Sequence, residues 1–121
     1  MRSEEQYLVD IVEAAEAIAR FIDGVDREAF LQDEMRQSAV MQKIGVIGEA
    51  ARKISPALQN KYPEAAWPQV IGMRNILVHG YYSVKAIIIW QTAVQSIPEI
   101  SKQVTQILAK EFPSSLSENS G

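Results

Sequence analysis

Apolar side chains recur every three or four residues along two long stretches of this sequence. The two sets are Leu8, Ile11, Ala15, Ile18 and Ile22, and then Val40, Ile44, Ile47, Ala51 and Ile54. This period places each set on one face of an α-helix, because successive helical turns bring such positions together. We therefore expect two long amphipathic helices, from Ser3 to about Ile22 and from Asp33 to about Ile54. Ser3 and Asp33 are residue types that cap helix N-termini.

Shorter helical segments are expected around and after the second long helix. Asp26 can cap a short turn that runs to Phe30, and residues 57–61 can form another turn. Pro68 suits the first turn of a further helix that runs to about His79 and stops at Gly80, since proline favours helix starts and glycine favours helix ends.

The last helical segment is expected to begin near Ser83. Its sequence 96–99 reads Ser-Ile-Pro-Glu, which resembles a capping box. Two alternatives stay open there: a new helix starts at Ser96, or the existing helix kinks. The whole pattern predicts an all-α fold, an up-down bundle of four to five helices. Residues 1–111 are expected to form one domain, and the polar residues 112–121 a flexible tail.

Composition narrows the classes of chemistry that are open to the chain. Its 121 residues fit a single domain, and they include no cysteine and only one histidine, His79. Disulfides, cysteine-ligated zinc and a cysteine nucleophile are therefore excluded, and no metal site or cofactor is expected. The longest apolar run is residues 86–90, too short to span a membrane, and the N-terminus lacks the pattern of a secretory signal. The cytoplasm is the expected compartment.

Basic residues are concentrated in the middle of an acidic chain. The net charge is −3 overall, but residues 35–85 carry seven basic and only two acidic side chains. A local basic surface can bind phosphate whatever the net charge, because salt screens distant charges. Arg52, Lys53 and Lys43 are candidate contacts for an RNA backbone. The alternative is an ordinary solvated face with a Glu49–Lys53 pair.

Two glycines interrupt the second long helix. Gly45 and Gly48 share one face with Met41 and Arg52, beside the apolar stripe. Each glycine costs about 1 kcal/mol relative to alanine in a helix interior. Either the glycines permit tight packing within the bundle, or they leave room for a subunit interface or a site.

The residues from Arg74 to Tyr81 offer the clearest chemistry. Asn75 and His79 share a face at the end of their helix, since they are four residues apart. Histidine can exchange a proton near neutral pH, and arginine can hold a phosphate and stabilise developing charge. This set suits metal-free cleavage of RNA by attack of a 2′-hydroxyl on the adjacent phosphate. The alternative is a histidine that merely hydrogen-bonds a carbonyl at its helix end.

A single histidine does not readily act as both base and acid on two different oxygens. A two-fold dimer would supply a second His79 and a second Arg74 to one cleft. We therefore expect a homodimer.

The stretch Arg74 to Tyr81 resembles the Arg-x4-His-x-Tyr signature of HepT-like proteins in the HEPN superfamily. Residues 47–54, the Trp67-Pro68 entry and Trp90 add to the resemblance, which spans about Gln42 to Ile107. It implies an all-helical homodimer that is a metal-independent ribonuclease, the toxin of a type VII toxin–antitoxin pair. The implied partner is an MntA-type nucleotidyltransferase that uses ATP to attach AMP to the motif tyrosine.

Carried onto this sequence, the resemblance makes Arg74 and His79 catalytic, Asn75 supporting and Tyr81 the modified residue. Transfer RNA is favoured over messenger RNA as the substrate. The family often has an aspartate where this chain has Lys85, so Ser83 is expected to cap the next helix. Two other readings stay open: a non-catalytic helical dimer that binds and regulates a nucleotidyltransferase, and a bundle with no site.

Overall fold

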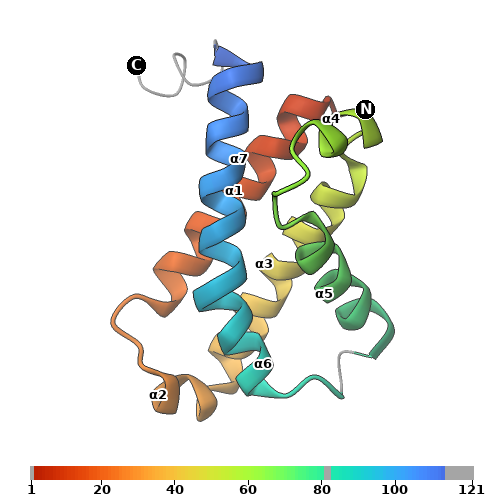
Figure 1. The fold of residues 1–121 in the computed structure, drawn as a ribbon. Helices are drawn as coiled ribbons and strands as arrows, with labels where there is room; N and C mark the ends of the chain where they lie inside the picture. Colours follow the sequence, from red (N-terminus) through yellow and green to blue (C-terminus); the bar gives the residue numbers. More distant parts are fainter. Residues whose placement is uncertain (1, 81–82, 114–121) are drawn as a thin grey trace.

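The computed structural model describes residues 2–80 and 83–113, and their regular structure is entirely helical. Four long helices, α1, α3, α5 and α7, alternate in direction along the bundle (Figure 1). Their bounds are Glu4–Ile22, Glu34–Lys53, Trp67–Gly80 and Ile97–Glu111. The predicted all-α, up-down bundle is therefore confirmed. The predicted tail lies largely outside the described residues, which end at Pro113.

Short helices fill the connections between the long ones. They are α2 (Arg27–Leu31), α4 (Pro56–Lys61), α6 (Ala86–Gln91) and a π-helical turn, η2 (Thr92–Ser96). Within residues 2–80 and 83–113, no helix is long and apolar enough to cross a membrane.

Side-chain caps fix the start of several helices, as the sequence predicts. The Ser3 hydroxyl accepts from the Gln6 backbone N–H, and the Gln6 side chain accepts from the Ser3 N–H in return. Asp26 and Asp33 likewise accept backbone N–H groups of α2 and α3. Gly24 has a φ of 71°, a left-handed conformation that glycine adopts without strain, and it turns the chain after α1.

The predicted apolar stripes form the core. Helix α3 lies between α1 and α5, and α1 also packs against α7. Leu8 and Ile11 of α1 and Ile44 and Ile47 of α3 are fully buried. Phe30 of α2 packs against Trp90 of α6, with ring centroids 5.2 Å apart. This core holds α3 and α5 in a defined register, which matters for the side chains between them.

The proposed capping box at Ser96 is wrong. Ser96 has helical backbone angles and its side chain caps nothing, because α6, η2 and α7 follow one another without a break. The distorted single helix is thus the correct alternative. Pro98 gives the physical reason: its ring would clash with the Val94 carbonyl in a regular α-helix. A wider π turn, in which the Ile97 N–H donates to the Thr92 carbonyl, relieves this clash.

The expected capping role of Ser83 is also wrong. Its hydroxyl donates to the Gly80 carbonyl at 2.7 Å, so it satisfies the end of α5. Lys85 occupies the N-cap position of α6 and makes no side-chain cap. The hydroxyl of Ser83 is used by the preceding helix, because Gly80 leaves an unpaired carbonyl close to it.

Candidate functional site

Helix α5 presents Arg74, Asn75 and His79 in two directions. Arg74 is half-buried against α3, whereas Asn75 and His79 are exposed. Arg74 and His79 are five residues apart, so they point about 140° apart around the helix axis. A single chain therefore brings Arg74 to Asn75 but does not direct Arg74 and His79 to one point.

The guanidinium of Arg74 has two polar partners. It donates to the Asn75 side-chain oxygen at 3.0 Å, and it forms an ion pair with Glu49 of α3 at 3.0 Å. The supporting position predicted for Asn75 is thus consistent with a direct contact to Arg74. This hydrogen bond holds the Arg74 guanidinium beside Asn75 on α5.

The sequence reasoning considered Glu49 only as a partner of Lys53 and missed its contacts with Arg52 and Arg74. Its carboxylate contacts Arg52, with oxygen–nitrogen distances of 2.8 and 3.3 Å, as well as Arg74. The Arg52 hydrogen bond, with the positive charges of Arg52, Arg74 and Lys53, lowers the pKa of Glu49. In return, Glu49 raises the pKa of Arg52. Glu49 is therefore ionised at neutral pH and bridges two guanidinium groups.

Spacing alone pairs Glu49 with either Arg52 or Lys53, one turn away. The structure selects Arg52, and Lys53 makes no ion pair within the described residues. The alternative Glu49–Lys53 pair is therefore not found. The signal that could have identified the role of Glu49 is its position next to Gly48, where α5 comes closest.

The two glycines of α3 have different roles. A Cβ on Gly48 would lie 2.1 Å from the Cβ of Arg74 and 2.6 Å from the Val70 carbonyl oxygen. Real Cβ atoms do not approach so closely, so Gly48 is required for the packing of α3 on α5. A Cβ on Gly45 would meet no atom within 4 Å. Of the two alternatives, tight packing applies to Gly48, whereas Gly45 borders open space.

That open space is a groove of about 520 Å³ between α1, α3 and α5. Its lining includes Tyr7 of α1, Gly45, Val46 and Glu49 of α3, and Arg74 and Val78 of α5. Val78 is 55% exposed. Arg74 and Glu49 thus border a groove with a largely apolar wall.

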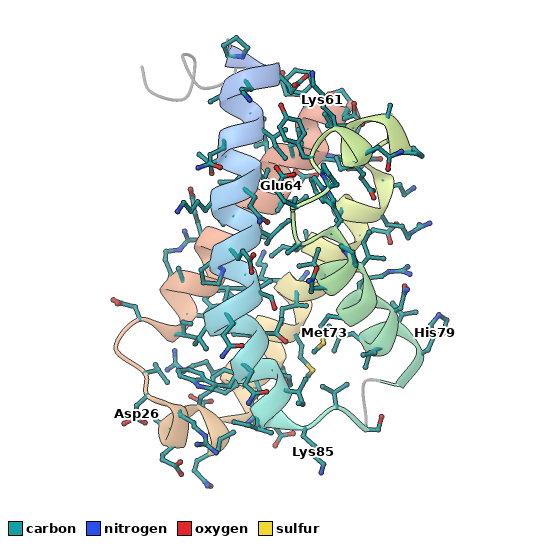
Figure 2. All side chains as sticks on the ribbon, viewed as in Figure 1. Asp26, Lys61, Glu64, Met73, His79 and Lys85 are labelled. Carbon is teal, nitrogen blue, oxygen red and sulfur yellow. The ribbon has the colours of Figure 1, made fainter. Side chains whose placement is uncertain are left out.

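His79 is exposed at the last turn of α5. Its side chain points away from the bundle, whereas Met73 on the same helix points inward (Figure 2). The imidazole makes no hydrogen bond to any of the described residues, so a carbonyl partner at the helix end is not found there. Tyr81, the residue expected to be modified, lies outside the described residues.

The predicted phosphate contacts occupy different surroundings. Arg52 and Lys53 are exposed near the end of α3. Lys43 instead lines a hollow with Asp10, Glu13 and Arg20 of α1. The local charge around Lys43 is therefore balanced, whereas the region of Arg52, Lys53 and Arg74 keeps a positive excess over Glu49.

Acidic side chains are sparse around these residues. Across residues 2–80 and 83–113, no group of three or more histidine, aspartate or glutamate side chains is arranged to hold a metal ion. The polar chemistry available at α5 is therefore that of two arginines, one carboxylate, one amide and one imidazole.

Comparison with known proteins assigns the chain to a family. The fold and site define an all-helical protein of the HEPN-like class, with a half-buried arginine and an exposed histidine on one helix. This chain belongs to the HepT-like ribonuclease family, whose model, described as "Ribonuclease HepT-like", matches residues 11–107.

Several relatives resemble the chain over most of its length. A protein of Caldanaerobacter subterraneus named as a candidate RNase is 33% identical over 111 residues, which is 92% of this chain and 99% of the relative. A candidate RNase of Methanocaldococcus jannaschii is 33% identical over 85% of this chain and 94% of its own. The "Probable ribonuclease HepT" of Thermococcus cleftensis is 36% identical over 82% of this chain and 90% of its own. No solved structure matches the chain.

Proposed function

We propose that this chain is a metal-independent endoribonuclease and the toxin of a type VII, HepT/MntA-like toxin–antitoxin pair. The observation that carries the proposal is the family membership of a chain that keeps Arg74 and His79 accessible on α5. RNA is the substrate class, and transfer RNA is favoured over messenger RNA.

The chemistry follows from the residue types. His79 of one chain removes the proton from a 2′-hydroxyl, whose oxygen attacks the adjacent phosphorus and forms a 2′,3′-cyclic phosphate. The bond from phosphorus to the 5′-oxygen breaks, and that oxygen takes a proton from the protonated His79 of the second chain of the dimer. Arg74 stabilises the negative charge that grows on the phosphate oxygens, and Asn75 orients Arg74 through their 3.0 Å hydrogen bond. No metal or other cofactor is needed for this reaction.

The site is completed in a homodimer. Each chain has one histidine, and its Arg74 points away from that histidine around α5. A two-fold partner is therefore the simplest source of both the second proton-transferring group and an arginine that faces it. Ile76, three residues before His79, is 51% exposed, so a partner that pairs at this end of α5 would cover an apolar side chain. The pairing places two copies of His79 at one cleft.

A nucleotidyltransferase of the MntA type silences the toxin. It transfers AMP from ATP to the Tyr81 phenol, and the added phosphate competes with RNA for Arg74. Residues 1–111 act as one domain, and the protein works in the cytoplasm.

One observation favours a second candidate function. In the single chain Arg74 is held by Glu49 rather than free, as would suit a non-catalytic helical dimer that binds and regulates the nucleotidyltransferase. The two functions differ in whether the protein alone harms the cell.

Expression without and with the partner tests the proposal. The toxin should arrest growth alone and be neutralised by the nucleotidyltransferase, and Tyr81→Phe should resist neutralisation while Tyr82→Phe does not. Mass spectrometry should locate AMP on Tyr81. Growth that is unaffected by the chain alone would reject the toxin and favour the regulatory dimer, and AMP on Tyr82 would reject the assignment of the modified residue.

A further inference from the structure

One carboxylate holds two guanidinium groups from two helices. Glu49 lies 2.8 Å from Arg52, one turn further along α3, and 3.0 Å from Arg74 of α5. The three side chains carry a net charge of +1, and the nearby charge of Lys53 adds to it. Two arginines that converge on one small anion form the same arrangement that binds a phosphate group in other sites.

The packing of the helices fixes this arrangement. Gly48 lets the Arg74 Cβ and the Val70 carbonyl approach α3 to distances that any side chain would forbid. Arg74 therefore starts close to α3, and Glu49, the residue next to Gly48, is placed to meet its guanidinium. The packing therefore fixes where the backbones of Arg52 and Arg74 lie, whether or not Glu49 is between their guanidinium groups.

Glu49 can leave at little cost. Its side chain is 40% exposed and that of Arg52 is 47% exposed, so water and salt weaken their ion pair. Lys53 lies four residues after Glu49, within reach on the same helix, and it makes no ion pair in the part of the chain that the structure describes. A displaced Glu49 carboxylate would therefore still have a cation one helical turn away.

We propose that Arg52 and Arg74 form a binding site for one RNA backbone phosphate, and that Glu49 occupies this site until the phosphate displaces it. The proposal rests on the proposed ribonuclease function for the identity of the anion. It makes Arg52 a ligand beside Arg74 rather than a distant contact. It also makes Glu49 a built-in competitor of RNA.

Binding of an uncleavable RNA tests the proposal. The probe is a mixed-sequence 2′-O-methyl oligonucleotide, which keeps the phosphates but lacks the attacking hydroxyl. Glu49→Gln removes the competing charge, and Glu49→Asp keeps the charge but withdraws it from Arg74. Both variants should bind the probe about threefold to tenfold more tightly than wild type at low salt, the size expected for one freed charged contact.

A matched control separates this effect from net charge. Glu111 also bridges two partners, Lys61 at 2.8 Å and Tyr62 at 2.6 Å, and neither partner is Arg52 or Arg74. Glu111→Gln changes the net charge equally and should leave affinity for the probe unchanged.

The remaining outcomes distinguish the two proposals. If wild type cleaves RNA and binds the probe but neither Glu49 variant binds more tightly, the displacement by phosphate is overturned while the ribonuclease function stands. If only Glu49→Gln binds more tightly, general electrostatics explains the gain and the displacement is again overturned. If wild type neither binds the probe nor cleaves RNA, both proposals fail.

Discussion

At the scale of single residues, Arg74 and His79 differ in how firmly the fold holds them. Arg74 has two polar partners and packs its Cβ against Gly48. His79 is exposed and has no hydrogen-bond partner among the described residues. A mutation at either position should therefore be informative about chemistry, but only the His79 change is expected to leave the bundle undisturbed.

Replacement of Arg74 should affect both catalysis and folding, unlike replacement of His79, because the fold holds Arg74 by several contacts. Arg74→Ala should lower the cleavage rate about 10²- to 10³-fold, as the loss of one charge-stabilising contact does. Arg74→Lys keeps the charge but cannot bridge Glu49 and Asn75 in the same way, so it should recover only part of the rate. Single-turnover cleavage and circular dichroism on the same samples measure both effects. A variant with wild-type activity at Arg74→Ala would remove this residue from the site.

At the scale of elements, the contact between α3 and α5 positions the site. Gly48→Ala should destabilise the protein by about 1–3 kcal/mol, because the new methyl overlaps the Arg74 Cβ and the Val70 carbonyl. Gly45→Ala is the matched control, since its methyl meets nothing within 4 Å, and it should stabilise the helix by up to about 1 kcal/mol. Urea unfolding measures both. Equal effects at the two positions would contradict the close approach of the helices.

The contact between the end of α4 and α7 should make the free energy of unfolding depend on pH in the alkaline range. The Tyr62 hydroxyl donates to Glu111 at 2.6 Å, and this bond raises the pKa of Tyr62 from 10.0 to about 12. Because the folded pKa is the higher one, this contribution is complete below pH 10 and is lost as the pH rises towards 12. Wild type should therefore lose more stability than Tyr62→Phe between about pH 10 and pH 12 in urea unfolding. Identical losses in the two proteins would exclude the Tyr62–Glu111 bond.

The elements that the sequence predicts best are those whose cause is local. The stripes of α1 and α3, their caps at Ser3 and Asp33, and the stop at Gly80 all depend on neighbouring residues. The sequence pattern predicts caps at Ser83 and Ser96, but contacts with other segments override both. The Ser83 hydroxyl donates a hydrogen bond to the preceding helix. The π turn joins α6 to α7 without a break, so no helix starts at Ser96.

The site is harder to predict than the helices, because it depends on how they pack. Motif spacing selects Arg74, Asn75 and His79 on α5. It does not reveal that Glu49 bridges Arg52 and Arg74, since that contact exists only when α3 and α5 approach at Gly48. The surroundings of Lys43 likewise depend on acidic residues contributed by α1.

At the scale of the whole molecule, the proposed cleft requires two chains, because each chain supplies one His79. Sedimentation at micromolar concentration should give a dimer. Ile76 is 51% exposed near His79. If the proposed dimer pairs at this end of α5, Ile76→Glu should weaken the dimer and cleavage together, because it puts a charge into the interface. Val94→Glu, at a 38% exposed apolar residue on η2, is the control and should leave the dimer intact. A monomer that still cleaves RNA would contradict the shared site.

The most direct test of the central claim is the cleavage rate of a transfer RNA in EDTA, by wild type and by His79→Ala. Wild type should cleave with chelator present, and the variant should be slower by at least about 10²-fold, as expected on loss of a general acid–base group. The variant should unfold at the same urea concentration, since His79 is exposed. Cleavage that stops in EDTA and returns with magnesium, or that persists in His79→Ala, would contradict the account.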